Sequence, residues 1–485
     1  MRRSLGSRRR LLAITCSVFA LIVLVTIRQN HIQASTIKLG FEPVDPSKVD
    51  LAAASCPLDA NYLSLNTHGL TDEILFHRKC IKGRRDAGVN RTVVGDVPQP
   101  LLDEGHVLNI KGDCNQWQSM PCDAVEVDVP VPFPERRYPE FLFGVATSYD
   151  RLMDSRLQFA HWLGGTGARL VAVIVDIANH EADLNRMTVA FKRYDIDLFI
   201  AGPWGTLGPN EQHFTIVHDL VHHLTAETKW IGIIDDDTFF PSMWPLVEAL
   251  KFQDHRQAAY IGGLSEDVGA IERHGMLAFG GAGAFLTVPL LVELEPWIDT
   301  CVTEDSTPQG DGLLKNCIYS KTATRLTVIG GLHQVDIIGT VDGFYESGLL
   351  PVSLHHWKSW HHAPVDQMAK LTDYCGGCLL QRWRFGQDTV LSNGYTVVRY
   401  ENGIGLDELE KPEGTWDNPQ LYEWSLGHLR PAVPSEQKKS YYLVESERVG
   451  SYLRQVYIYN NFQYFMHGRE GHSTRDEVVE IWWEW

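Results

Sequence analysis

The sequence predicts an α/β fold in which a sheet is covered by helices on both faces. Three segments are almost unbroken apolar runs of strand length, and they alternate with stretches that suit helices, such as Met153 to Leu163. The apolar runs are residues 141–147, 170–176 and 196–200. Strands that read as continuous apolar runs are typical of parallel sheets buried on both sides. Ligands of such sheets bind at the carboxyl ends of the strands.

A fourth apolar strand ends in three consecutive aspartates. A helix is expected from Phe214 to Glu227, and the apolar strand that follows it leads directly into Asp235, Asp236 and Asp237. Residues 241–250 again suit a helix. The triplet therefore lies at the carboxyl end of a buried strand, where a ligand is expected.

These aspartates suit a divalent cation. A departing nucleotide diphosphate needs its charge neutralised by a cation that hard oxygen ligands hold. Asp235 and Asp237 lie on one side of an extended strand end and could supply those ligands. The alternative is an acidic turn that caps the next helix. A similar pair, Asp195 and Asp197, precedes a strand instead of following one, so placement favours the triplet as the metal site.

Two loops further along the chain carry candidate residues. The glycine cluster 280–284 follows an apolar stretch, and glycines there would let the backbone approach a sugar closely; a tight turn explains them equally well. Asp311 lies between Cys301 and Cys317, and a disulfide between these cysteines could fix its loop. A carboxylate that is not tied to a metal could act as the general base that takes a proton from an acceptor hydroxyl. The alternative for Asp311 is an Asp-Gly turn.

Four histidines lie within residues 355–362. In an extended segment His355 and His356 face opposite ways, so only one of them is expected to join the aspartates around a metal. So dense a cluster is not typical of core packing, which favours a functional role for one of them.

The nearby pair Cys375 and Cys378 offers an alternative use of this region. Together with His361 and His362 the pair could bind zinc. In an oxidising compartment a disulfide between the two cysteines is the favoured prediction.

The parts outside residues 140–402 have a different character. Residues 28–139 are predicted to form a stem and a small disulfide-held subdomain, and residues 403–485 a β-rich appendage dense in Trp and Tyr. Eight of the nine cysteines lie beyond residue 28, which allows four disulfides. They are Cys56, Cys80, Cys114, Cys122, Cys301, Cys317, Cys375 and Cys378.

The N-terminal segment predicts a single-pass type II membrane protein. Residues 11–27 are apolar and uncharged, and arginines dominate residues 1–10, which are expected to stay in the cytoplasm. A cleaved signal peptide ending near Ala34 is the alternative. The rest of the chain would then be lumenal, where the sequon at Asn90 can be glycosylated. The span is slightly short, which suits the thinner early secretory membranes, and a Golgi location is expected.

Composition excludes two broad classes. Hydrophobic residues make up 44% of the chain, which is enough for a sizeable core and argues against disorder. The formal net charge of −18 argues against a nucleic-acid partner.

Taken in chain order, three motifs resemble the fringe and core 1 β1,3-galactosyltransferase group of family 31 glycosyltransferases, and most of all its fungal members. They are the strand and aspartates of residues 229–238, Phe279 to Gly283, and the Gly-Phe-Tyr-Glu-Ser-Gly stretch that leads to His355. The resemblance covers roughly residues 141–402. It implies a GT-A fold with a mixed sheet, a UDP-sugar donor, Mn²⁺, a glycan or glycoprotein acceptor, and inversion that gives a β1,3 linkage.

The resemblance also implies roles for individual residues. Asp237 matches the metal-binding aspartate, His355 matches the histidine that completes the metal site, and Asp311 takes the place of the catalytic base. The family usually has Pro-Asp-Asp there, whereas this chain has Gln309-Gly310-Asp311. Asp235 is assigned to the metal with them. The residues assigned to the donor are Thr147, Arg156, Asp236, Gly281 and Gly283.

Two other functions use the same residues. A catalytically silent relative could act as a chaperone or bind glycans, although the intact aspartates and His355 argue against it. A phosphohydrolase could hold two cations with aspartates and histidines, but it would be expected to show more metal-ligand motifs at strand ends.

Overall fold

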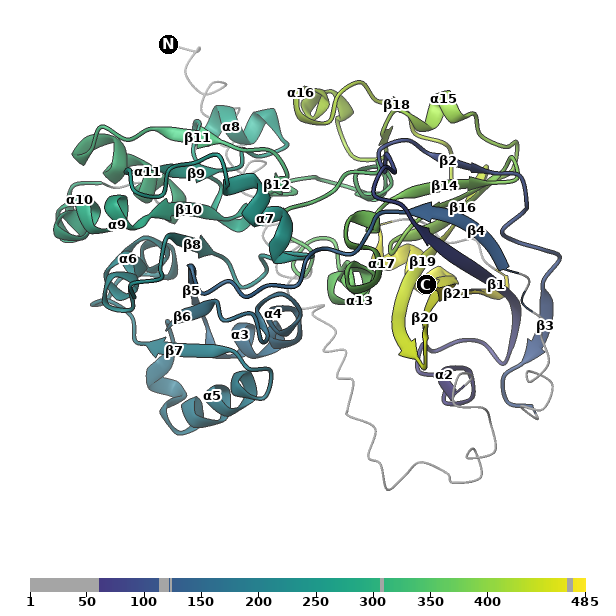
Figure 1. Ribbon diagram of the computed structural model, residues 1–485, viewed down its shortest axis with the longest axis horizontal. Coiled ribbons are helices and arrows are strands. Elements are labelled where there is room, and N and C mark those ends of the chain that lie inside the picture. The colour runs from purple at the N-terminus through teal and green to yellow at the C-terminus, as the bar shows by residue number, and fades with distance from the viewer. Residues whose placement is uncertain (1–60, 113–121, 123, 306–308, 469–473) are drawn as a thin grey trace, which may run out of the picture. The chain divides into compact units, whose positions relative to one another are not determined.

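Two large sheets organise the protein, one of seven strands and one of ten (Figure 1). The computed structural model describes residues 61–112, 122, 124–305, 309–468 and 474–485. The predicted cytoplasmic tail, the apolar span 11–27 and the alternative cleavage site near Ala34 lie outside these residues. Within the described ranges, no helix combines the length and apolar character needed to cross a membrane.

The seven-stranded sheet confirms the α/β class and shows that the sheet is mixed. Its strand order is β11-β9-β10-β8-β5-β6-β7. β5 pairs in parallel with β6 and β8, and β6 with β7, while β10 runs antiparallel to β8 and β9. The strands are β5 (Phe141–Thr147), β6 (Arg169–Ile174), β7 (Asp197–Ala201), β8 (Trp230–Ile234), β9 (Tyr260–Gly262), β10 (Ala284–Thr287) and β11 (Leu326–Val328).

Both faces of this sheet are buried, because successive residues of each strand join different cores. In β8, for example, Ile231 and Ile233 belong to one core, whereas Trp230 and Ile234 belong to the other. The first core is completed by α6 (Pro209–His222), α9 (Val288–Leu294), α10 (Ile298–Glu304) and α11 (Gly310–Lys321). Helices that contribute to the second core include α3 (Tyr149–Asp154), α4 (Arg156–Leu163), α5 (Leu184–Lys192) and α7 (Met243–Leu250).

Local signals set the helix boundaries. The single helix expected over 153–163 is two helices, α3 and α4, which meet at Ser155. α6 begins at Pro209, a residue that favours the first helical position, so it starts and ends about five residues earlier than predicted. Ser242 caps α7 by accepting a hydrogen bond from the Trp244 amide.

The ten-stranded sheet joins the two ends of the described chain. β1 lies between β21 and β3, pairs in parallel with β21 over nine residues, and also pairs in parallel with β4. The β-rich C-terminal region is therefore confirmed, but its sheet crosses the boundaries placed at residues 139 and 402. The strands are β1 (Glu73–Arg85), β2 (Gly95–Val97), β3 (His106–Asn109), β4 (Ala124–Val129), β14 (Arg382–Phe385), β15 (Thr389–Ser392), β16 (Thr396–Tyr400), β19 (Lys438–Val449), β20 (Tyr452–Tyr459) and β21 (Asp476–Glu484).

Short elements fill the connections. Two small parallel sheets pair β12 (Leu332–His333) with β13 (Ser353–Leu354) and β17 (Glu413–Gly414) with β18 (Arg430–Pro431). The remaining helices are α2 (Asn61–Ser64), α8 (Val268–His274), α12 (Asp342–Tyr345), α13 (Val365–Ala369), α14 (Thr372–Cys375), α15 (Leu406–Leu409), α16 (Glu423–Leu426) and α17 (Asn461–Met466).

Six of the eight cysteines beyond residue 28 form disulfides, namely Cys80–Cys122, Cys301–Cys317 and Cys375–Cys378. The second one braces α10 against α11 beside the loop of Asp311, as expected. The third confirms the favoured prediction for this pair and rules out its use as a zinc ligand pair. Cys56 and Cys114 lie outside the described residues.

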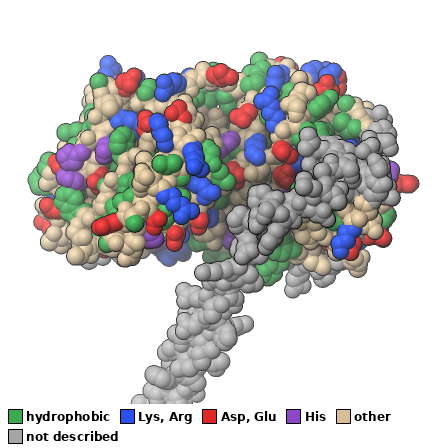
Figure 2. Space-filling model, turned by 90° about the horizontal axis from the view of Figure 1, so that it is seen from below, with side chains coloured by type: hydrophobic (Ala, Val, Ile, Leu, Met, Phe, Trp, Pro, Cys, Tyr) green, Lys and Arg blue, Asp and Glu red, His purple; other side chains and the backbone are tan. Residues whose placement is uncertain are grey.

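The protein surface carries both signs of charge. On the face seen in Figure 2, acidic and basic side chains lie next to one another and form no continuous field of one sign. Exposed pairs such as Arg84 with Asp128 contribute little to stability, because water screens them.

Candidate active site

The three aspartates follow β8 directly, and a hydrogen-bonded turn fixes them. The Asp235 amide donates to the Thr238 hydroxyl (2.9 Å), which in turn donates to the Gly281 carbonyl (2.8 Å). This chain of bonds ties the acidic turn to the glycine cluster. Asp236 and Asp237 are buried, whereas the Asp235 side chain is 37% exposed.

A two-residue bridge brings His355 to these aspartates. Phe239 and Leu354 exchange two backbone hydrogen bonds of 2.8 Å, although they are far apart in the sequence. The next residue, His355, then places Nε2 3.0 Å from Oδ1 of Asp237 and 3.4 Å from Oδ2 of Asp235. The structure thus brings together the three residues predicted to hold a metal.

His356 departs from the expectation that only one of the two histidines faces the aspartates. Its φ of 54° is left-handed, so the alternation of an extended strand does not apply here. The His355 and His356 rings lie 3.8 Å apart between centroids, and ligand atoms of Asp237, His355 and His356 come within 4.8 Å of one another. The prediction about their directions was wrong, because it assumed regular strand geometry.

The chemistry of this group fits a divalent cation. Carboxylate oxygens and imidazole nitrogens are the ligands that manganese and similar first-row metals accept. His355 is buried, and its Nδ1 has no hydrogen-bond partner within the described part of the chain. Asp237, His355 and Asp235 would hold the cation. His356 lies beside them, but its two ring nitrogens contact Asp336 and Ser359.

Charges at the site are strongly coupled. Burial opposes the protonation of His213 and His355, but their hydrogen bonds to carboxylates outweigh it and raise the pKa of each to about 10. Burial likewise opposes the ionisation of Asp235, yet hydrogen bonds from the same two histidines hold its pKa well below the usual value. Asp235 therefore lies between two imidazole groups that favour its charged form.

His213, on α6, is a residue that the sequence analysis missed. Its Nδ1 lies 3.3 Å from Oδ1 of Asp235, and its Nε2 lies 3.0 Å from Oδ1 of Asp311. It therefore links the metal side of the site to the candidate base. A Cβ at Gly280 would come within 2.5 Å of its Nε2, and one at Gly310 within 2.7 Å of its Cβ.

Asp311 lies in the first turn of α11. Its Oδ2 accepts a hydrogen bond of 2.9 Å from the Gly280 amide. Gly310 leaves no room for a side chain, because a Cβ there would lie 2.4 Å from the Asn210 carbonyl. The side chain of Asp311 remains partly exposed and borders a cavity.

Of the side chains assigned to the donor, Thr147 contacts Asp236 and Arg156 does not. The Thr147 hydroxyl donates to Oδ1 of Asp236 (3.0 Å), and Arg151 Nε donates to the same oxygen (2.8 Å). Lys358 Nζ lies 3.7 Å from the other oxygen. Arg156 instead donates to the Met153 carbonyl. Nothing in the sequence distinguishes Arg151 from Arg156, which begins the next helix, so Arg151 was not predicted.

A glycine is needed at each of the two positions assigned to the donor, for different steric reasons. At Gly281 a Cβ would lie 2.2 Å from the His355 ring, so only glycine leaves room for that histidine. Gly283 has a φ of 102°, which side chains rarely adopt.

Exchanging either arginine for glutamine should distinguish their roles. If a nucleotide such as UDP binds at this strand end, Arg151→Gln should weaken its binding about tenfold, because the charged hydrogen bond to Asp236 is lost. Arg156→Gln, the matched control, should leave the dissociation constant within about twofold. Calorimetric titration of both variants with UDP and Mn²⁺ measures this. A larger loss in Arg156→Gln would support the role predicted from the sequence.

Comparisons with known proteins cover only part of the chain. Residues 271–372 match the model of a family described as "Protein of unknown function, DUF604", which is less than half of the chain. The match includes the glycine cluster, Asp311 and His355, but not the aspartate triplet. A search of curated proteins returned no relative.

Among solved structures the overlaps are partial. The glycosyltransferase GlyE of Streptococcus pneumoniae shares 12% identity, with 39% of this chain and 46% of that chain covered and a TM-score of 0.27. Mouse xyloside xylosyltransferase 1 shares 11% identity, covering 39% and 84% with a TM-score of 0.28. The mannosyltransferase PcManGT of Pyrobaculum calidifontis, solved with GDP-mannose and Mn²⁺, shares 14% identity, covering 44% and 61% with a TM-score of 0.28. This chain thus spans less than half of the GlyE structure.

The fold class follows from the strand order and from the position of the acidic turn. A mixed sheet in the order β11-β9-β10-β8-β5-β6-β7, with an acidic turn after β8, is a GT-A-type fold. The aspartates follow the carboxyl end of a parallel strand, which is the end at which α/β sheets bind ligands.

Proposed function

We propose that the protein is a metal-dependent glycosyltransferase that moves a sugar from a UDP-sugar to a hydroxyl group of a glycan or glycoprotein. The observation that carries this proposal is the convergence of Asp235, Asp237 and His355 at the end of β8, with Asp311 linked to them through His213. Metal ligands and a separate carboxylate are the two parts that direct displacement requires.

Different residues act on the sugar donor and on the acceptor hydroxyl. A bound Mn²⁺ would neutralise the charge of the diphosphate as the bond between sugar and phosphate breaks. Arg151 and Lys358 add positive charge on the donor side, around Asp236. Asp311 takes the proton of the acceptor hydroxyl, whose oxygen forms the new bond to the anomeric carbon. Attack opposite the departing UDP inverts that carbon, and the resemblance to family 31 favours a β1,3 linkage.

The phosphohydrolase alternative has less support. Hydrolases of that kind use two cations about 4 Å apart. Within the residues that the structure describes, a single group of side chains is arranged to hold a cation. The alternative of a catalytically silent relative likewise has no specific support, because the candidate base, the metal ligands and the cavity are all present.

The direct test is release of UDP. The lumenal region should be incubated with Mn²⁺ and a panel of UDP-sugars, with and without candidate glycan acceptors. We expect one donor to give UDP release that an acceptor accelerates and that removal of the metal by EDTA abolishes. If no UDP-sugar binds with or without Mn²⁺, the proposal is wrong.

Metal affinity should depend on pH through His355. A cation can bind this imidazole only after its proton has left. Because its pKa is raised to about 10, binding between pH 6 and 8.5 should release one proton. The affinity for Mn²⁺ should then fall roughly tenfold for each unit by which the pH falls.

Calorimetric titration with Mn²⁺ at several pH values checks this expectation. In His355→Gln the affinity should be lower and its dependence on pH flatter. An affinity of the parent that stays constant from pH 6 to 8.5 would remove His355 from the metal site.

We further propose that residues 11–27 anchor the protein in the Golgi membrane, with the catalytic region in the lumen. Asn90 is exposed in a turn, and the Thr92 hydroxyl donates to its side-chain oxygen (2.7 Å). The chain expressed in cells should therefore carry one glycan that a glycosidase removes and that Asn90→Gln abolishes. Full sensitivity to protease added outside intact vesicles would reverse the proposed orientation.

A further inference from the structure

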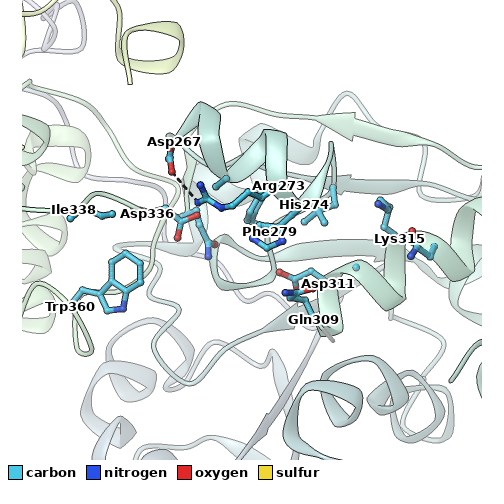
Figure 3. A pocket seen from close by; sticks show the side chains of 15 residues that line it. Asp267, Arg273, His274, Phe279, Gln309, Asp311, Lys315, Asp336, Ile338 and Trp360 are labelled. Atoms are coloured by element: carbon cyan, nitrogen blue, oxygen red, sulfur yellow. Dashed lines mark hydrogen bonds and ion pairs between the residues drawn. The ribbon is translucent and has the colours of Figure 1, made fainter. Parts of the chain in front are cut away.

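A cavity of about 520 Å³ lies in the ten-stranded sheet, apart from the candidate active site. β16 and β20 end at it and β19 begins at it, because β19 runs antiparallel to both of these neighbours. Among the described residues, none that lines the cavity beside Asp311 (Figure 3) also lines this one. A cavity of this size accepts a small ligand or the end of a longer chain.

Charged side chains are held in place on one face of the sheet at this cavity. Arg399 of β16 and Lys439 of β19 lie directly opposite each other, so they point to the same face. Arg399 Nε donates to Asp388 (3.2 Å), and Lys439 Nζ donates to Glu477 (2.7 Å). Arg399, Lys439 and Asp388 nevertheless remain partly exposed. These donors and acceptors are therefore ordered in advance and still accessible to a ligand.

Tyr459, the last residue of β20, supplies an aromatic wall. Its ring centroid lies 4.8 Å from Lys439 Nζ, and the Tyr464 ring packs against it almost at a right angle, with centroids 5.1 Å apart. Tyr459 is half-buried, and its hydroxyl forms no hydrogen bond with any described residue. A tyrosine held in this way offers a ligand both an apolar ring and a polar tip.

Two exposed polar side chains stand at the cavity without partners. The Glu401 amide donates to the Gln437 carbonyl (2.9 Å), and the Gln437 amide donates to the Pro434 carbonyl (2.9 Å), so the backbone beside the cavity is fixed. The side chains of Glu401 and Gln437 form no hydrogen bond or ion pair with any described residue. A carboxylate and an amide together offer acceptors and donors, which a ligand can use without breaking an existing contact.

The charges around the cavity cancel. Three basic and three acidic side chains line it, namely Arg399, Lys438, Lys439, Asp388, Glu401 and Glu436. Such a cavity selects neither anions nor cations by its net charge. Many donors and acceptors around an aromatic wall suit a neutral ligand that is rich in hydroxyl groups. A sugar has this character, because its C–H groups pack on an aromatic ring while its hydroxyls form hydrogen bonds.

Two common modes of peptide recognition do not fit the cavity. β16, β19 and β20 each have a neighbouring strand on both sides, so none of them has a free edge to which an extended peptide could add. The described residues that line the cavity include no aliphatic side chain. An amphipathic helix would therefore find no apolar groove there. These observations favour a glycan over a peptide, and the experiment below includes a peptide.

We infer that this cavity is a second carbohydrate site, which binds a neutral glycan away from the metal ligands and the candidate base. A glycoprotein held there by one part of its glycans would be presented to the catalytic site of the same chain at a raised effective concentration. The inference does not depend on the proposed transfer reaction, because binding at this cavity requires neither UDP nor a metal.

Saturation-transfer NMR on the full chain tests this inference without UDP or metal, in a detergent that has no sugar head group. The probes are the methyl α- and β-glycosides of galactose, glucose, mannose and N-acetylglucosamine, together with a short neutral peptide of glycine, serine and threonine. We expect at least one glycoside to bind and the peptide not to bind. Tyr459→Ala should weaken glycoside binding about tenfold or more, whereas Tyr459→Phe should retain most of it.

A second variant keeps the test valid if Tyr459→Ala does not fold. Glu401→Ala combined with Gln437→Ala removes two exposed side chains that have no described partner, so the fold should not change. We expect this double variant to bind the glycoside about fivefold more weakly or worse. Tyr452→Ala is the matched control, because Tyr452 belongs to the same strand, is 38% exposed and does not line the cavity. The control should bind as the parent does.

Three outcomes would overturn the inference. The first is that no glycoside binds, or that only the peptide does. The second is that binding survives in Tyr459→Ala, or in the double variant if Tyr459→Ala does not fold. The third is that Asp311→Asn abolishes the glycoside signal, which would assign that signal to the catalytic site. A separate sample with UDP and Mg²⁺ keeps the two proposals apart, since a missing UDP signal there counts against the transfer reaction alone.

Discussion

Replacing Asp237 with alanine should abolish metal-dependent binding of the UDP-sugar and leave the fold intact. Asp237 is buried, its Oδ1 lies 3.0 Å from His355, and its other oxygen accepts a hydrogen bond from Ser359. Loss of this carboxylate removes a charged ligand and leaves the imidazole without its closest partner. Because even outer-shell changes cost 10- to 100-fold in metal affinity, we expect the affinity for Mn²⁺ and UDP to fall by more than about 100-fold.

Calorimetry with Mn²⁺ and UDP measures this loss, and circular dichroism reports on the fold. Asp197→Ala is the matched control, since it removes the same charge at the opposite end of a parallel strand, where Asp197 pairs with the exposed Lys192. The control should bind donor and metal normally. Full donor affinity in Asp237→Ala would exclude it as a metal ligand.

Asp311→Asn should bind UDP-sugar and metal as the parent does but transfer the sugar about 100-fold more slowly or worse, which is the usual contribution of a positioned base. The amide keeps the size of the side chain but cannot take the acceptor proton. One oxygen of Asp311 accepts a hydrogen bond from the Gly280 amide and the other lies 3.0 Å from His213 Nε2, so the neutral amide loses the ion pair with His213. We therefore expect a loss of about 1 kcal/mol in the free energy of unfolding.

Two measurements on one preparation separate the roles of Asp311. Near-normal transfer would remove Asp311 from the mechanism. Lost donor binding with a normal fold would instead assign it to the support of the site through His213.

The seven-stranded sheet could be predicted because its strands are buried on both sides. β5, β6 and β8 are short apolar runs that only a covered sheet accommodates. The ten-stranded sheet could not be predicted in the same way. Apolar alternation predicts that β1 and β21 are strands, but it carries no information about pairing between segments some 400 residues apart.

Some residues of the candidate site could likewise be predicted from the sequence, and others could not. The aspartates could be located because they follow a recognisable strand, and their sequence position fixes their place in the sheet. His213 could not be located from the sequence. It is one of several histidines on helices, and only its contacts with the loops of Gly280 and Gly310 in the folded protein distinguish it. His356 was misplaced for a different reason, since a single residue with φ of 54° turns its side chain to the same side as that of His355.

The pairing of β1 with β21 has a consequence for the order of events during synthesis. Ile74 pairs with Asp476, so at roughly 5–20 residues per second β1 leaves the ribosome roughly 20 to 80 seconds before its neighbour. The segments that build the seven-stranded sheet emerge in between and can fold first. Until β21 has emerged, the edge of β1 that pairs with it stays unpaired. The chain would most need chaperones during this interval. Substitutions in β1 or β21 should therefore reduce the yield of folded protein more than they change the activity of the molecules that do fold.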